Sequence, residues 1–454
     1  MSQSTYASSI AEGGKLGTLF SRGSGLGNYS ITSQSFISVD PANLNAGQNI
    51  FIPKGFIAIV SAGGSVNSAV AAVQVAVGIG VDGVLAVEQD ITGPGIGQNS
   101  NFSLNWVVQG DGNIHNITLM ARTSVVADAC VILNTTATNA PYLMVEITQS
   151  SFLGVSTYGS SVSEARGKLG ATLITGSAAG NYSSTTSVFQ PVDGGGGQLT
   201  MRVQIPLGFA LLVAAAGAVG STGGTAVAVG LLVDGVLKTE QDITPHGTTQ
   251  LSAFGLSYVV VGDGSIHSIA LAYRGTAGGN VTIGNNSATH VPIIMAELTQ
   301  SNFSGQQVYS SSESEGGKLG VIFLFGGGLG NYASNSQSFV NVDSTLLSQS
   351  IVVPKGYVLM IAGAGVAGSA TAAVQVGVGI TVDGVLVAET DVQGAAAGNL
   401  VGFDVQYMIV GDGNAHTVAL VFRTNATADN VVIGNSPVTN VPSLLLELTP
   451  SNIN

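Results

Sequence analysis

The chain has 454 residues, of which 45% are hydrophobic and only 8% are charged, and 64 are glycine. This composition excludes a disordered chain, which needs low hydrophobicity and high charge, and a helical bundle, which is rich in Glu, Lys, Leu and Arg. The formal net charge is −13. An acidic chain repels phosphate, so we expect no nucleic-acid partner and no binding to anionic membranes. The single cysteine, Cys130, excludes a disulfide framework and a CxxC metal or redox site.

The N-terminal segment MSQSTYASSIAEGGKLG has neither a basic region nor an apolar core, so we expect no Sec signal peptide and synthesis in the cytoplasm. The most apolar stretch spans residues 208–233 and is interrupted by the polar segment STGGT at 221–225. A membrane span needs about 20 unbroken apolar residues. We therefore expect two strands and a turn there, and no membrane insertion.

Internal repetition is the strongest signal in the chain. GDGNIHNITL at 110 recurs as GDGSIHSIAL at 262 and GDGNAHTVAL at 411, and VDGVL recurs at 81, 233 and 382. The landmarks keep one order and nearly one spacing, which indicates triplication of a domain over residues 1–150, 151–301 and 302–454. The ten steps from residue 148 to 158 span at most about 33 Å, less than the diameter of about 40 Å of such a domain. We therefore expect the domains to lie side by side.

Period-two alternation predicts the strands. In the run 102–108, Phe102, Leu104, Trp106 and Val108 alternate with smaller or polar residues, and the same pattern returns at 254–260 and 403–409. Each run leads to an Asp-Gly pair at 111, 263 or 412, which predicts a tight hairpin and a returning strand. Roughly eight short strands per unit, Gly-rich turns and no amphipathic helix predict an all-β chain of three antiparallel, jelly-roll-like β-sandwiches.

A second alternating strand covers residues 73–81 and ends at Asp82-Gly83, another predicted hairpin. Its apolar face is made of valine and isoleucine, and its other face carries Gln74, Ala76, Gly78 and Gly80. Such small side chains let another surface approach closely. That surface is either a neighbouring strand of the same domain or a contact between domains or subunits.

Three histidines share one repeated position just after the Asp-Gly turns. They are His115, His267 and His416. We expect structural histidines at the rim of each core, hydrogen-bonded to the turn backbone or to the turn aspartate. The alternative is that a threefold arrangement of the domains brings the three rings together as a metal or anion site, which requires a common axis.

Acidic side chains are triplicated too, at Asp82, Asp111, Glu146 and their copies. Two further sets lie two residues apart on one strand, and an arginine set offers partners for them. The sets are Glu88, Glu240 and Glu389; Asp90, Asp242 and Asp391; and Arg122, Arg274 and Arg423. We expect structural ion pairs between these acids and arginines. Calcium binding and glycoside hydrolysis by paired carboxylates are the alternatives. We otherwise expect no cofactor and no catalytic residue, because no GxSxG, HExxH or P-loop motif is present.

Three tyrosines lie in repeated Gly-Asn-Tyr segments, which are candidate loops. These residues, Tyr29, Tyr182 and Tyr332, are the best candidates for a stacking surface that binds a sugar, beside a plain role in a turn or interface. The aromatic position of Trp106 shares strand parity with Phe102 and Leu104, so we expect it to pack in the core.

The chain resembles bacteriophage and other virion appendage proteins, namely capsid decoration proteins, fibres and tail-associated β-sandwiches. The resemblance rests on Pro-x-Gly before a core strand, on the Val-Asp-Gly-Val-Leu segments and on the Gly-Asp-Gly-x-x-His segments, and it covers all three units. It implies a non-enzymatic structural protein of a virion or extracellular particle, which assembles with copies of itself or with other virion or filament subunits. The alternative is an adhesin with one weak site per repeat for cell-surface glycans, which gains avidity from triplication.

Overall fold

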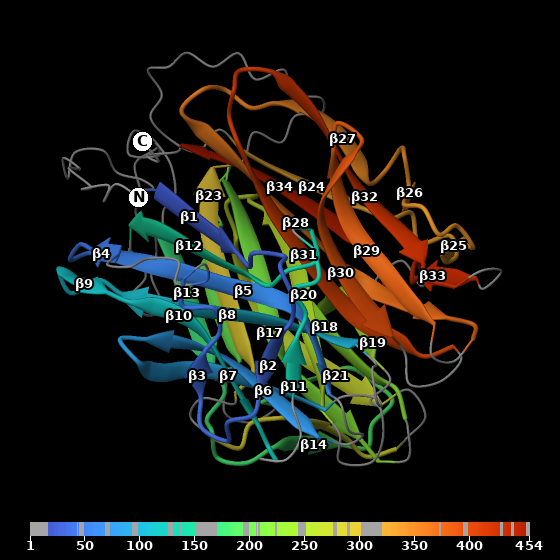
Figure 1. The fold of residues 1–454 in the computed structure, drawn as a ribbon. Helices are drawn as coiled ribbons and strands as arrows, with labels where there is room; N and C mark the ends of the chain where they lie inside the picture. Colours follow the sequence, from blue (N-terminus) through green and yellow to red (C-terminus); the bar gives the residue numbers. More distant parts are fainter. Residues whose placement is uncertain are drawn as a thin grey trace.

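A computed structural model describes residues 17–42, 44, 50–68, 73–92, 99–125, 130–136, 138–149, 170–193, 199–205, 207, 209–222, 225–243, 251–275, 279–287, 291–300, 320–371, 374–393, 398–426, 430–436 and 440–450. These residues form β-strands and no helix (Figure 1), which confirms the predicted all-β class. Within the same ranges there is accordingly no helix long and apolar enough to cross a membrane.

The first repeat contains twelve described strands. They are β1 (Gly17–Arg22), β2 (Tyr29–Ile31), β3 (Ile37–Ser38), β4 (Ile50–Ile52), β5 (Phe56–Ser68), β6 (Gln74–Val81), β7 (Val84–Thr92), β8 (Asn99–Gln109), β9 (Asn113–His115), β10 (Ile117–Thr123), β11 (Cys130–Ile132) and β12 (Tyr142–Gln149). The prediction of about eight strands missed short ones such as β3, which are too brief to show alternation.

The second and third repeats follow the same order with eleven described strands each. The second contains β13 (Gly170–Thr175), β14 (Tyr182–Ser184), β15 (Gln190–Pro191), β16 (Thr200–Gln204), β17 (Phe209–Ser221), β18 (Val227–Val233), β19 (Val236–Ile243), β20 (Ser252–Val261), β21 (Ile266–Gly275), β22 (Val281–Ile283) and β23 (Ile293–Gln300). The third contains β24 (Gly320–Phe325), β25 (Tyr332–Ser334), β26 (Val340–Asn341), β27 (Ser348–Val352), β28 (Tyr357–Ser369), β29 (Gln375–Val382), β30 (Val385–Gln393), β31 (Leu400–Val410), β32 (Ala415–Thr424), β33 (Val431–Ile433) and β34 (Ser443–Pro450).

Each repeat is a sandwich of two antiparallel sheets. In the first repeat, one sheet has the order β1-β12-β5-β11-β2, with β8 on the free side of β5, and the facing sheet has the order β3-β10-β6-β7. The other repeats have the same order, with β20 and β31 in the place of β8. Their facing sheets gain one strand, since β16 pairs with β21 and β27 with β32, whereas the equivalent β4 pairs with β9 in a separate two-stranded sheet. A closed apolar core lies between the two sheets of every repeat, because alternate valines, leucines and isoleucines of both sheets point inward.

One predicted hairpin is confirmed and one is wrong. Val81 pairs with Val84 across Asp82-Gly83, where both turn residues have positive φ (53° and 78°), so this is a two-residue turn of the type that Asp-Gly favours. By contrast, β8 pairs with β5, whereas β10 pairs with β3 and β6 in the other sheet. The Asp111-Gly112 turn therefore carries the chain from one sheet to the other. The aspartate plays its expected part in this turn, since Asp111 accepts a hydrogen bond from the Asn113 amide at 2.8 Å. The two strands on either side of the turn, however, pair with other strands and not with each other.

The small-residue face of β6 packs within its own repeat. A Cβ atom on Gly78 would lie 2.5 Å from Leu85 Cδ1, and one on Gly80 would lie 2.4 Å from Met120 Sδ. The structure therefore supports the first of the two interpretations, in which side chains of the same domain cover these glycines.

Candidate functional site at the pseudo-threefold axis

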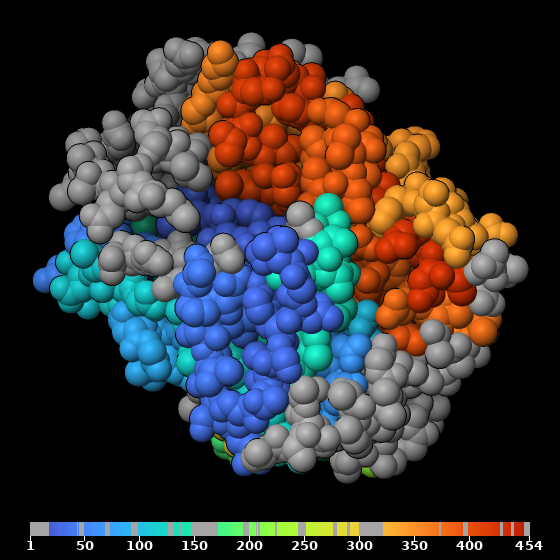
Figure 2. Space-filling model, viewed as in Figure 1, coloured from blue at the N-terminus to red at the C-terminus, as the bar shows by residue number. Residues whose placement is uncertain are grey.

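The three sandwiches close into a ring. The outward face of the sheet that holds β5 points toward the other repeats, and the strands β8, β20 and β31 contact one another. Equivalent positions make equivalent contacts from each repeat to the next, and from the third back to the first. These contacts are Ile57 and Ile59 with Ala171, Ala210 and Leu212 with Val321, and Met360 with Thr18. Figure 2 shows the first repeat (blue to cyan) in direct contact with the third (orange to red). We call the line at the centre of the ring the pseudo-threefold axis, and the three contacts the 1/2, 2/3 and 3/1 seams.

Buried glutamines join two of the seams. The Nε2 atom of Gln89, on β7, donates a hydrogen bond to the Gly217 carbonyl of the second repeat at 2.6 Å. Its Oε1 atom accepts one from the Ser103 amide of its own repeat at 3.1 Å. Gln241 does the same at the 2/3 seam, where it donates to the Gly365 carbonyl at 2.9 Å. Each glutamine thus connects a strand of its own repeat to the central strand of the next.

The 3/1 seam has different chemistry. Thr390 stands where the other repeats have glutamine, and its hydroxyl donates to Asn101 Oδ1 at 2.8 Å. Asp404, on β31, accepts a hydrogen bond from the Ser103 hydroxyl of the first repeat at 2.7 Å. Arg22, on β1, donates to the carbonyl oxygens of Val387 in the third repeat and Thr138 in the first, and burial lowers its pKa to about 10. Sequence reasoning missed these residues because each occurs in one repeat only.

The predicted arginine partners lie beside their acids, next to the seams. Arg122 Nη2 lies 3.3 Å from Glu88 and 3.4 Å from Asp90, and each guanidinium of the three repeats also lies over a phenylalanine ring. The other distances are 3.7 Å for Arg274 to Glu240, 3.9 Å for Arg274 to Asp242 and 2.6 Å for Arg423 to Glu389. Two carboxylates therefore share one guanidinium in this arrangement, which leaves a surplus negative charge near each seam.

Burial and like charge perturb the second acid of these clusters. Burial, together with the negative charge of Glu389, raises the pKa of Asp391 to about 7. The pKa of Asp242 is also raised by burial. Both residues accept a hydrogen bond from an asparagine of the neighbouring repeat, Asn139 to Asp391 at 2.7 Å and Asn440 to Asp242 at 3.2 Å.

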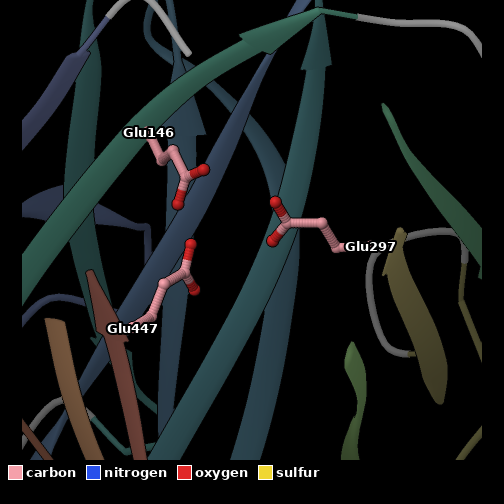
Figure 3. Close-up of side chains that lie close together, drawn as sticks. All are labelled: Glu146, Glu297 and Glu447. Atoms are coloured by element: carbon pink, nitrogen blue, oxygen red, sulfur yellow. The ribbon is translucent and has the colours of Figure 1, made fainter. Parts of the chain in front are cut away.

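Three glutamates, one from each repeat, meet at the axis (Figure 3). Glu146, Glu297 and Glu447 are all buried, and each offers a carboxylate oxygen that lies within 4.8 Å of the other two. They line a cavity of about 110 Å³ together with apolar side chains and with polar side chains that include Asn105, Asp404 and Gln406. Carboxylate and amide oxygens are the ligands that hard divalent cations prefer, so this group could hold such an ion. The sequence indicates this glutamate group through its neighbours in the strand. Val145 and Ile147 point into the core, so Glu146 between them points to the outward face of the sheet.

The three histidines do not meet. Each lies at the outer end of its own sandwich, where its ring joins the two Asp-Gly turns. His115 Nδ1 lies 2.8 Å from Asp82 and Nε2 lies 3.1 Å from Asp111, and the copies repeat these contacts at 2.7 and 3.1 Å. Partial desolvation lowers the pKa of His115, but the hydrogen bonds to both aspartates outweigh it and raise that pKa. We call this Asp-His-Asp group the histidine clamp.

The candidate tyrosines are tied into their own repeats. The Tyr29 hydroxyl donates to Asp40, and the Tyr332 hydroxyl donates to Asp343 at 2.9 Å. The Tyr182 hydroxyl accepts a hydrogen bond from the Ser177 amide at 3.3 Å. All three rings are half-buried and pack against the core of their repeat.

No protein-family model matches the chain, and no curated protein matches its sequence. Solved structures resemble it weakly. PNGF-II shares 8% identity and a TM-score of 0.24, over 86% of this chain and 99% of that one. The triple jelly roll of an archaeal virus turret shares 12% identity and a TM-score of 0.17, over 95% and 91%. Tandem family 51 carbohydrate-binding modules from Streptococcus pneumoniae share 12% identity and a TM-score of 0.15, over 55% and 81%. Likenesses this weak carry no argument about the architecture or the function of this chain.

Proposed function

We propose that the protein is a non-enzymatic structural subunit of a virion or extracellular filament, built as a fused pseudo-trimer. The observation that carries the proposal is the closed ring of three equivalent repeats. The described inward-facing surfaces lie in the cores, the seams and the axial cavity, and the landmarks recur in all three repeats, so the three repeats present the same framework to their surroundings. A block that offers the same outer surface three times suits a position of threefold symmetry in a larger assembly.

The outer surface supports this role. Charged residues are only 8% of the chain, so small polar and apolar side chains must cover much of the exterior. The hairpin between β6 and β7, and its copies between β18 and β19 and between β29 and β30, present a valine to solvent at the same place in every repeat. These are Val84, Val236 and Val385, with 70%, 56% and 65% of their surface exposed. One exposed valine needs no explanation, but three at equivalent tips form a repeated apolar contact point.

The test is assembly of the purified chain, followed by light scattering and negative-stain electron microscopy over a range of concentrations. The proposal predicts regular oligomers, tubes or lattices, and it predicts that the triple variant V84S/V236S/V385S loses them without a change in melting temperature. V188S, which alters an exposed valine outside these tips, is the matched control and should assemble normally. A chain that stays monomeric at every concentration and associates with no particle would contradict the proposal.

Glycan binding remains the second hypothesis from the sequence, and no contact among the described residues favours it. The three loop tyrosines place their hydroxyls and rings against their own repeats. A glycan array with Y182A as the variant, which removes the stacking ring, would revive the hypothesis only if the chain bound and the folded variant did not.

A further inference from the structure

The chain connections allow two orders of the three repeats around the ring. Viewed along the axis, the repeats can follow one another as 1, 2, 3 or as 1, 3, 2. Residues 150–169 and 301–319 join consecutive repeats, and a segment of about 20 residues reaches as far as about 66 Å, more than the diameter of about 40 Å of one sandwich. The surfaces that meet at the seams must therefore select the order.

Each seam brings a residue of one repeat against a residue of the next at equivalent positions. The inserting residue comes from β7, β19 or β30, and the receiving residue comes from β8, β20 or β31. Ala253 packs against the core of the first repeat, which places it at the 1/2 seam, and Gly402 lies beside Gln241 at the 2/3 seam. The pairs are Gln89 with Ala253, Gln241 with Gly402 and Thr390 with Asn101. Two seams thus pair glutamine with a very small residue, and the third pairs threonine with asparagine.

Glutamine fits where the receiving residue is small. Gln241 is fixed by two hydrogen bonds, since its Nε2 atom donates to the Gly365 carbonyl at 2.9 Å and its Oε1 atom accepts from the Gly255 amide at 3.3 Å. A Cβ atom on Gly402 would lie 3.2 Å from that Oε1 atom. Alanine, as at Ala253, adds this Cβ atom alone, whereas asparagine would add an amide group and displace the glutamine from its bonds.

Threonine fits where the receiving repeat brings an acceptor. The Thr390 hydroxyl donates to Asn101 Oδ1 at 2.8 Å and lies 3.0 Å from Ser65 Oγ, which donates to the same Oδ1 atom at 3.0 Å. All three side chains are buried. In the second repeat the positions of Asn101 and Ser65 are taken by Ala253 and Ala218. A buried threonine hydroxyl would have neither of its present partners there, which is costly.

A further contact of the 3/1 seam follows the same rule. Asp404, on β31, accepts a hydrogen bond from the Ser103 hydroxyl at 2.7 Å. The second repeat has Gly255 at the position of Ser103 and offers no hydroxyl there. The third repeat therefore makes two side-chain contacts that the first repeat completes and the second cannot.

We propose that the three inserting and receiving pairs form a seam code, which sets the cyclic order of the repeats by letting the third repeat accept the first and reject the second. In the order 1, 3, 2, Thr390 would meet Ala253 without an acceptor, and Gln241 would meet Asn101, so that two side-chain amides would need one space. Two of the three seams would be mismatched in that order, and none is mismatched in the observed one. The code depends on the ring and not on any partner of the whole chain.

A cycle of substitutions at the 3/1 seam measures this recognition. T390Q places glutamine against Asn101, S65A/N101A removes the polar receiving groups, and S65A/N101A/T390Q rebuilds the glutamine and alanine pair of the 1/2 seam. In calorimetry, T390Q and S65A/N101A should each lower the melting temperature by about 2–4 °C. The combined variant should lose less than about half of the sum of these two shifts. T390S, which keeps the hydroxyl, is the control and should melt within about 1 °C of the wild type.

Two results of this cycle would overturn the seam code. The first is a combined variant whose loss equals the sum of the separate losses, because the two sides of the seam would then not recognise each other. The second is a combined variant that fails to fold when T390Q alone also fails. A combined variant that folds where T390Q does not would support the code, since the matched pair would have rescued the chain.

Cysteine pairs report the order itself. The Thr18 hydroxyl lies 4.0 Å from Met360 Sδ at the 3/1 seam, and the equivalent positions of the first and third repeats, which would meet in the reversed order, are Ile59 and Val321. In chains that also carry C130A, T18C/M360C should form a disulfide after refolding, and I59C/V321C should form little.

Exchanging the inserting residues of the second and third repeats should reverse this preference. Q241T/T390Q matches all three pairs in the order 1, 3, 2 and mismatches two in the order 1, 2, 3. Added to the I59C/V321C chain, it should raise the yield of that disulfide at least about tenfold. A folded Q241T/T390Q chain that closes through T18C and M360C as the wild type does, with no rise in the other disulfide, would overturn the code.

Discussion

Removing the side chain of Gln89 tests the seams most sharply, because this residue is 2% exposed and bonds two repeats at once. The variant Q89A deletes the hydrogen bond to the Gly217 carbonyl at 2.6 Å and the bond from the Ser103 amide at 3.1 Å. Each buried hydrogen bond contributes roughly 1 kcal/mol, and each buried backbone group left without a partner costs about 1–3 kcal/mol. We therefore expect Q89A to lose about 3 kcal/mol of stability.

Differential scanning calorimetry is the assay. A chain of this length has an unfolding entropy of about 1 kcal/mol per kelvin when it melts as one unit, so the melting temperature of Q89A should fall by about 3 °C. The melting temperature of Q241A, the equivalent change at the 2/3 seam, should fall by a similar amount. Q34A removes an exposed glutamine that donates to the Ser124 carbonyl at 3.0 Å, and it should shift by less than about 0.5 °C. If Q89A melts like Q34A, the repeats do not depend on this contact and the reasoning is refuted.

Three further predictions concern the clamp, the axis and the packing of β6. The aspartates raise the pKa of His115, His267 and His416 above the ordinary value of 6.5, so the clamps stabilise the fold fully below pH 6.5 and lose this effect as the pH rises through the raised pKa. The triple His→Gln variant should therefore have a lower melting temperature than the wild type at pH 5.5 and the same melting temperature at pH 9. An equal difference in melting temperature at both pH values would contradict this. In EDTA at pH 8, E447Q should raise the melting temperature by removing one of three crowded carboxylates, and a lower melting temperature would show that the charge is needed. G78A should cost about 1–3 kcal/mol in urea titrations, since its Cβ would lie 2.7 Å from the Val87 carbonyl, and an unchanged midpoint would disprove that packing.

The sandwich class was predictable because it rests on short-range patterns. Alternation along 102–108 and 73–81 marks strands with one buried face, and the structure buries Phe102 and Ile79 completely. The Asp82-Gly83 hairpin follows from two residues that adopt positive φ readily. The Asp111-Gly112 turn shows the limit of such patterns, because the same dipeptide also serves a crossover between sheets. Which strand pairs with which is a long-range choice, decided here by β5 and its 13 residues at the centre of one sheet.

The axis was less predictable. Triplication indicates three equivalent domains but leaves a ring and a row equally open, since both bury the same kind of surface between neighbours. Glu146 and its copies are visible in the sequence as triplicated acids, yet only the packing of outward faces brings them within 4.8 Å. Arg22 and Asp404 break the repeat pattern. Repetition therefore predicts the sandwiches, whereas the departures from it mark the seam that closes the ring.

Small-angle X-ray scattering of the monodisperse chain at mild acid pH tests the central claim, which is that the three sandwiches form a closed ring. A compact chain of this length has a radius of gyration of about 22 Å, and three such sandwiches in a row would give about 36 Å. The account predicts a value of about 22–25 Å with a single-peaked distance distribution. A value above about 30 Å with a long tail would contradict it.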